Sequence, residues 1–181
     1  REAACRGEMC ELNGGELPDA RGEDAETIRP ALIRFLARGG NPDHPVDPRG
    51  VQLRGAVIAD ALDLRACEGL RPLLLASCRF DADVILLDAA GQSIALQGCA
   101  VQGIEADGLS VTGGVFLRHG FRAAGAVRLL GARIDGVLDC SGGAIEGVDA
   151  DRNSLHADGL SVTGDVFLGN GFRAAGAVRL V

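Results

Sequence analysis

From Val51 onward, apolar residues come in pairs separated by a single residue, and short turn-like gaps separate one pair from the next. Alternate residues of an extended chain point to the same side, so each pair is a minimal strand with two inward side chains. The pairs run from Val51-x-Leu53 to Leu138-x-Cys140, mostly on steps of five or six residues. Steps this short exclude long strands and helices, and they predict a coil of very short parallel strands.

A long near-repeat supports this interpretation. The segment from Ala106 to Leu129, ADGLSVTGGVFLRHGFRAAGAVRL, returns 51 residues later as ADGLSVTGDVFLGNGFRAAGAVRL, from Ala157 to Leu180. The copies differ only at the pairs Gly114/Asp165, Arg118/Gly169 and His119/Asn170. Repeats of this kind are typical of solenoids, in which each unit buries its apolar face only against its neighbours.

A second alignment indicates the size of one coil. Residues 51–64 (VQLRGAVIADALDL) match residues 127–140 (VRLLGARIDGVLDC) at an offset of 76, which is 25 more than 51. Two coils of four faces or three coils of three faces would both fit the long repeat. The difference of 25 favours the first, so we predict a four-sided β-solenoid with coils near 25 residues.

The chain divides into three parts. Residues 1–22 form a polar tail, which we expect to be mobile unless it docks. Residues 23–49 combine a capping helix with a proline-rich connector that has no periodicity, and residues 50–181 form the β-helix repeat domain. Within that domain, the charged run GVDADRNSLH, from Gly147 to His156, interrupts the pattern and predicts a loop.

The capping helix is predicted from four apolar residues at helical spacing, Ile28, Leu32, Phe35 and Leu36. It extends over Asp24–Arg38, or begins nearer Thr27 if Pro30 has to lie in the first turn. Exposed terminal coils of solenoids need a cap with a polar outer face, so we expect this helix to cover the open end of the first coil. At the opposite end, the last coil would expose an unpaired edge that a partner or self-association must cover.

Composition narrows the function classes. Apolar residues make up 47% of the chain but aromatic residues only 3%, which suits thin layers of aliphatic side chains. The net charge of −7 disfavours nonspecific binding to nucleic acid, although a local arginine stripe is compatible with it. No apolar stretch is long enough to span a membrane, and the N-terminal residues do not resemble a signal peptide. We therefore expect a cytoplasmic protein without membrane association.

The residue types that carry most enzyme chemistry are few. Four cysteines, Cys67, Cys78, Cys99 and Cys140, lie in apolar patterns and are expected in the core, whereas Cys5 and Cys10 lack the second pair that a zinc site needs. The histidines, His44, His119 and His156, occupy positions that vary between repeats or lie in the connector, so we expect solvated faces. The recurring carboxylates are likewise expected on a solvated face, because aromatic platforms for a sugar are scarce.

Several phrases of the chain resemble a known family. The runs IRPALIRFLARGGNPDHPVDPRGVQLRGAVIADALDL, GLRPLLLASCRFDADVILLDA, ADGLSVTGDVFL and GARIDGVLDCSGG look like actinobacterial β-helical proteins related to pentapeptide-repeat proteins. Members are often labelled membrane-associated oxidoreductases. The resemblance covers roughly residues 25–181 and implies a right-handed parallel β-helix, but it brings no catalytic residues. Steps of six residues are also similar to those of bactofilins, which form filaments.

The oxidoreductase label has no support in the residues. The chain has no Gly-x-Gly-x-x-Gly between a strand and a helix, no Cys-x-x-Cys and no aromatic platform for a flavin. We therefore predict no cofactor, no metal site and no catalytic residues. An orphan activity on an acidic or hydroxylated small molecule is the enzyme alternative, for which no residues can be named.

The function that the sequence favours is a non-enzymatic structural or protein-interaction module. It would bind a protein partner or self-associate through the open C-terminal coil. The alternatives are a filament-forming scaffold and an acidic mimic of DNA that inhibits a DNA-binding enzyme. Outward charged residues form the possible interaction face: Arg54, Arg65, Arg79, Arg128, Arg133, Asp63 and Asp139.

Overall fold

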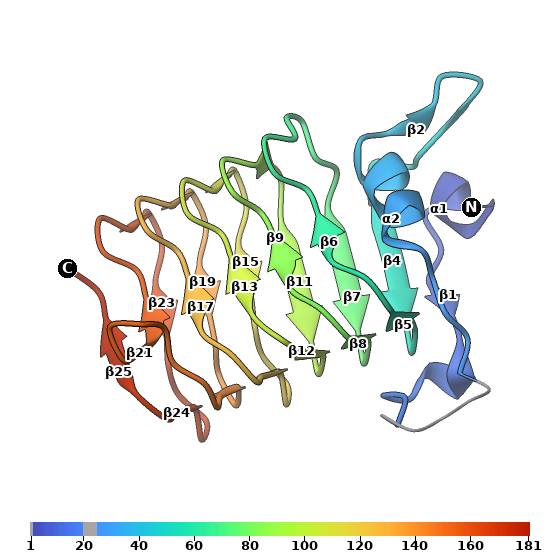
Figure 1. The fold of residues 1–181 in the computed structure, drawn as a ribbon. Coiled ribbons are helices and arrows are strands. Elements are labelled where there is room, and N and C mark those ends of the chain that lie inside the picture. The colour runs from blue at the N-terminus through green and yellow to red at the C-terminus, as the bar shows by residue number, and fades with distance from the viewer. Residues whose placement is uncertain (1, 20–24) are drawn as a thin grey trace.

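The computed structural model describes residues 2–19 and 25–181. Its main body is a parallel β-solenoid of about six turns, in which four parallel sheets form the four sides (Figure 1). We name the sheets A, B, C and D in the order in which the chain passes through them within each coil. The predicted four-sided solenoid is confirmed.

Sheet A contains β1 (Cys10–Glu11), β4 (Val51–Arg54), β7 (Leu73–Ala76), β11 (Ile94–Gln97), β15 (Val115–Phe116), β19 (Leu138–Asp139) and β23 (Val166–Phe167). Sheet B contains β5 (Val57–Ile58), β8 (Arg79–Phe80), β12 (Ala100–Val101), β16 (Arg122–Ala123), β20 (Ala144–Ile145) and β24 (Arg173–Ala174). Sheet C contains β6 (Leu62–Asp63), β9 (Val84–Ile85), β13 (Ile104–Glu105), β17 (Val127–Arg128), β21 (Asn153–His156) and β25 (Ala177–Arg179). Sheet D contains β10 (Ala90–Gly91), β14 (Ser110–Val111), β18 (Arg133–Ile134) and β22 (Ser161–Val162).

The strand register of sheet A gives the length of each coil, because paired residues lie one coil apart. Starting from β4, the paired positions are Val51, Leu73, Ile94, Val115, Leu138 and Val166. All of these coils except the last are shorter than predicted. Val166 is the copy of Val115 in the long repeat and lies two coils further along, so the repeat comprises two coils, as predicted.

The second alignment misled because it joined different sides of the solenoid. Val51 lies on sheet A, whereas Val127, its partner at the offset of 76, lies on sheet C. Every side uses the same motif of two inward apolar residues, so sequence similarity alone does not reveal which side a segment occupies.

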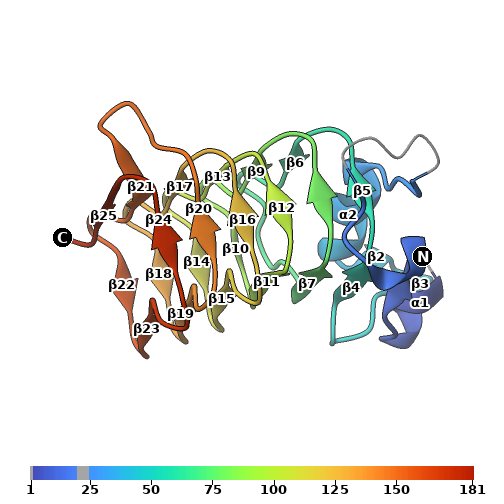
Figure 2. The same cartoon turned by 90° about the horizontal axis from the view of Figure 1, so that it is seen from below.

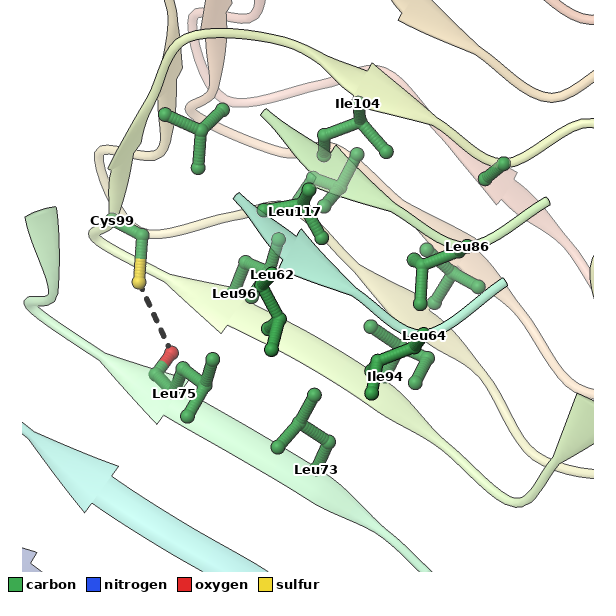
Figure 3. Close-up of a cluster of buried hydrophobic side chains, with 14 of the residues drawn as sticks. Leu62, Leu64, Leu73, Leu75, Leu86, Ile94, Leu96, Cys99, Ile104 and Leu117 are labelled. Atoms are coloured by element: carbon green, nitrogen blue, oxygen red, sulfur yellow. Dashed lines mark hydrogen bonds between the residues drawn. The ribbon is translucent and has the colours of Figure 1, made fainter. Parts of the chain in front are cut away.

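The inward side chains form one continuous core along the solenoid (Figure 3). Leu75 and Leu96 stack in register on adjacent coils of sheet A, and both are fully buried. The Cys99 thiol lies within 3.3 Å of the Leu75 carbonyl oxygen and donates to it, which makes this cysteine part of the core. Cys67, Cys78 and Cys140 are buried as well, which confirms the prediction for all four cysteines.

The capping helix is shorter than predicted. The helix α2 (Pro30–Ala37) begins at Pro30, and the preceding Arg29 is extended. Proline lacks an N–H and restricts the residue before it to extended conformations, so it fits the first position of the helix. Residue 24 lies outside the described residues. The buried side chains of α2 are Ile33, Leu36 and Ala37, whereas Phe35 is exposed, so the predicted apolar face was wrong at that position.

The N-terminal residues close the first coil. The described part of the polar tail, residues 2–19, is docked: after α1 (Glu2–Arg6), strand β1 pairs in parallel with β4, and a 3₁₀ turn (Asn13–Gly15) follows. On sheet B, Thr27 forms a parallel bridge with Val57. The expected connector contains a short antiparallel hairpin, β2 (Gly40–Asn41) and β3 (His44–Pro45). Both α2 and the docked tail lie at the opposite end of the solenoid from β25 (Figure 1).

The predicted loop is partly a strand. Residues 153–156 form β21 on sheet C, and the loop proper lies between β20 and β21, where it projects from the corner of the solenoid (Figure 2). This insertion makes the coil from Leu138 to Val166 the longest of those between β4 and β23.

The packing of the core predicts that two adjacent positions of β18 differ strongly in how much a substitution by aspartate destabilises the fold. Ile134 is buried and points inward, so Ile134→Asp places an unpaired charge between two coils, and we expect it to lower the free energy of unfolding by about 3–5 kcal/mol. Arg133 is exposed, so Arg133→Asp should change it by no more than about 0.5 kcal/mol. Urea denaturation of both variants measures this, and equal losses would contradict the inward and outward assignment.

Candidate functional site

The seven charged residues of the predicted interaction face lie on all four sides of the solenoid. Sheet A carries Arg54 and Asp139, sheet B carries Arg79, sheet C carries Asp63 and Arg128, sheet D carries Arg133, and Arg65 follows β6. The structure brings two of them together, because Arg65 Nε lies 3.1 Å from Asp63 Oδ2. The seven residues do not share one surface.

Most of the other charged residues of the predicted face pair with residues that are not part of it. Arg128 Nη2 lies 2.7 Å from Asp107 Oδ2, and this hydrogen bond raises the pKa of Arg128. The pair recurs two coils later, where Arg179 Nε lies 2.7 Å from Asp158 Oδ2. Pairs at partly exposed positions contribute only about 0–1 kcal/mol each, but they neutralise acidic side chains that a mimic of DNA would need.

His156 departs from the expectation of a solvated face. Its side chain is 10% exposed, and its Nδ1 lies 2.8 Å from Asp149 Oδ2. His156 points outward from β21, as the pattern predicts, but the loop between β20 and β21 folds back over it. The expectation was therefore wrong for His156, because an insertion covered a position that would otherwise face water. His44 is exposed, in line with the expectation.

Asp149 is the centre of this arrangement. Its Oδ1 accepts hydrogen bonds from the backbone N–H groups of Asp151 and Asn153, at 2.9 and 2.8 Å. Together with the hydrogen bond to His156, these contacts lower the pKa of Asp149 to about 2. We call Asp149, Asn153 and His156 the loop clasp, because they fasten the loop to sheet C.

The loop clasp and its neighbour Asp151 bring together three side chains of types that bind metal ions. Asp149, Asp151 and His156 each offer a ligand atom, and these atoms lie within 4.8 Å of one another. Both carboxylate oxygens of Asp149 already accept hydrogen bonds. In the sheet register, Arg128 and Arg179 flank His156 on either side, and each of them is paired with a carboxylate of its own. These contacts favour a structural role.

Two of the buried thiols, those of Cys99 and Cys140, are poor nucleophiles. Burial raises the pKa of the Cys140 thiol to about 12 and also raises the pKa of Cys99 well above its usual value. A thiol attacks as the thiolate, and these two remain protonated at neutral pH.

The outer edge of the last coil exposes residues that belong to a core. We define the C-terminal edge as the outer side of β22, β23, β24 and β25. There, Val166, Val178 and Leu180 are 38%, 38% and 44% exposed. Their counterparts in the first copy of the repeat, Val115, Val127 and Leu129, are 4%, 0% and 1% exposed. The same sequence is thus buried where a coil covers it and exposed where none does among the described residues.

The backbone of the C-terminal edge is unpaired as well. In the first copy, the N–H groups of Val115 and Leu117 donate to the carbonyl oxygens of Val137 and Asp139 in the next coil. Within the described residues, β23 pairs only with β19, so the equivalent groups of the second copy face outward.

A feature that the sequence analysis missed lies on the outer side of sheet A. A shallow hollow of about 390 Å³ has Leu74 and Ala95 in its floor, with Phe116 and Arg118 at one end. The signal in the sequence was Leu74, which breaks the alternation of β7 by placing a large apolar side chain at an outward position. Which outward residues become neighbours depends on the coil length, so the hollow could not be located without the register.

Comparisons with family models, curated proteins and solved structures give no match for this chain. Among the described residues, no helix has the length and apolar character to cross a membrane. The evidence for a function therefore comes from the surfaces of this protein, chiefly the C-terminal edge.

The loop clasp predicts a pH dependence of stability. Because folding lowers the pKa of Asp149 to about 2, its charged form stabilises the fold above the unfolded-state pKa, about 3.9. That contribution is lost as the pH falls from about 4 to about 2. We expect Asp149→Asn to be less stable than the unchanged protein at neutral pH, and the difference to shrink over this range.

Urea denaturation at a series of pH values measures this difference. The control is Asp151→Asn, which changes an exposed carboxylate of the same loop. A difference between Asp149→Asn and the unchanged protein that stays constant down to about pH 2 would contradict the role of the clasp.

Proposed function

We propose that this protein is a non-enzymatic structural and protein-interaction module that binds a protein partner, or a second copy of itself, at the C-terminal edge. The observation that carries the proposal is the contrast between the two copies of the repeat. Val127 is fully buried beneath the next coil, and its copy Val178 is 38% exposed. A partner surface shaped like a further coil would bury the exposed apolar side chains of this edge and pair its backbone N–H and C=O groups.

The two ends of the solenoid differ, and this difference favours a limited assembly over a filament. At the first coil, β1 occupies the edge of β4, and α2 covers the interior with Ile33 and Leu36. Head-to-tail stacking of two copies would require β1 and α2 to be displaced from the first coil. Association of two C-terminal edges requires no such rearrangement.

The charge distribution disfavours the other alternative, a mimic of DNA. Asp63, Asp107, Asp139 and Asp158 each lie within 3.1 Å of an arginine side chain. Paired charges of opposite sign do not produce the extended negative field that attracts a DNA-binding protein.

Light scattering over a concentration series tests self-association. We expect the average mass to rise with concentration, and Val178→Lys to weaken the association at least tenfold. A lysine at an exposed edge opposes edge-to-edge pairing and can extend its charge into water.

The matched control is Ser110→Lys, which places the same side chain on the exposed side of sheet D. This variant should associate as the unchanged protein does. A mass that stays at one protomer throughout would contradict self-association, and stoichiometric binding of a nicotinamide or a flavin would contradict the non-enzymatic assignment.

A further inference from the structure

The hollow on the outer side of sheet A has an apolar floor. Ala95 pairs in register with Leu74 on one side and with Phe116 on the other, so these three outward side chains form one row across adjacent coils. Alanine is the smallest of the three, and it leaves a gap between two large apolar neighbours. Ala95 is only 7% exposed, because those neighbours stand above it.

The rim of the hollow is positively charged. Among the residues that line it are Arg49 and Arg118, and none of its lining residues is a carboxylate. This composition is unusual in a chain with a net charge of −7. The rim therefore favours an anionic occupant, whereas most of the molecular surface does not.

Arg118 is held in position at this rim. Its guanidinium carbon lies 4.8 Å from the centre of the Phe116 ring, and its Nη1 lies 3.0 Å from Asp139 Oδ2. Asp139 is on the far side of Arg118 and does not line the hollow. Among the described residues, Nη1 is the only guanidinium nitrogen of Arg118 that donates a hydrogen bond, so Nη2 retains donor capacity.

We infer that this hollow binds an acidic peptide segment in an extended conformation. One apolar side chain of the peptide occupies the gap over Ala95, between Leu74 and Phe116, and a flanking carboxylate binds Arg118. In an extended chain, every second residue points to the same side. An apolar residue with an acidic residue two positions away on either side therefore fits the hollow. This inference concerns a surface separate from the C-terminal edge and does not depend on the proposed association there.

Two features favour a peptide over a nucleic acid. The floor is formed by aliphatic side chains and offers a place for one apolar group. Two arginines are also few compared with the several phosphate contacts that support nucleic-acid binding. A single-stranded oligonucleotide is therefore a competing ligand that the experiment includes.

The test uses the pentapeptide Asp-Thr-Leu-Thr-Asp, labelled with fluorescein on its N-terminal amine and amidated at its C-terminus, in which threonine favours the extended conformation. Fluorescence anisotropy against the whole chain should show saturable binding that is at least tenfold tighter than that of the isosteric peptide Asn-Thr-Leu-Thr-Asn. Replacing the central leucine by glycine should weaken binding by a similar factor, and added salt should weaken binding of the acidic peptide.

Three variants and one control locate the binding. Ala95→Leu fills the gap and should weaken binding at least tenfold, whereas Ala100→Leu, the same change at an outward position of β12 on sheet B, should leave it unchanged. Arg118→Gln should weaken binding about five- to thirtyfold. Asp139→Asn removes the carboxylate that competes for Arg118 and should strengthen binding, an effect opposite in sign to that of any general loss of structure.

Circular dichroism confirms the fold of each variant before the titrations. The inference is overturned if the acidic and neutral peptides bind equally, if neither binds at millimolar concentration, or if Ala95→Leu binds as Ala100→Leu does. It is also overturned if oligothymidine binds more tightly than the acidic peptide. None of these outcomes affects the mass measured by light scattering. Peptide binding in the hollow and association at the C-terminal edge are therefore tested independently.

Discussion

The in-register stacking of one coil on the next is the interaction on which the whole structure depends. Each coil contributes about two inward side chains per sheet, and a layer this thin cannot exclude water by itself. Stability comes from the contact between layers, as Leu75 and Leu96 show where they lie fully buried on adjacent strands. The parallel hydrogen bonds hold neighbouring coils in register, so side chains and backbone impose the same geometry.

A fold that is stabilised only between neighbours has a particular problem at its two ends. At the N-terminal end, the problem is solved within the described chain, because β1, the Thr27 bridge and α2 supply a strand edge and an apolar layer that the repeat pattern lacks. At the C-terminal edge, the described residues provide no such layer. The first copy of the repeat shows how the same side chains are buried when a coil covers them.

The outward positions are constrained less strictly than the core positions. They tolerate charge, and the pairs Asp107–Arg128 and Asp158–Arg179 repeat because the sequence repeats. Local features that the repeat does not share arise where the sequence departs from the repeat pattern. The insertion between β20 and β21 converts His156 from a surface residue into part of the loop clasp, and the small Ala95 between Leu74 and Phe116 opens a hollow on sheet A.

The sequence by itself determined the solenoid, the inward positions and the burial of four cysteines, because a short-range pattern of alternate apolar residues dictates which side chains turn inward. It could not determine which side each segment occupies, since all sides use the same motif, and the alignment of Val51 with Val127 therefore gave a coil length that was too large. Only the tertiary structure decided which outward residues become neighbours. Contacts such as Arg118 with Asp139, or Ala95 with Phe116, depend on the register between coils, and a single insertion changes that register for every residue of its coil.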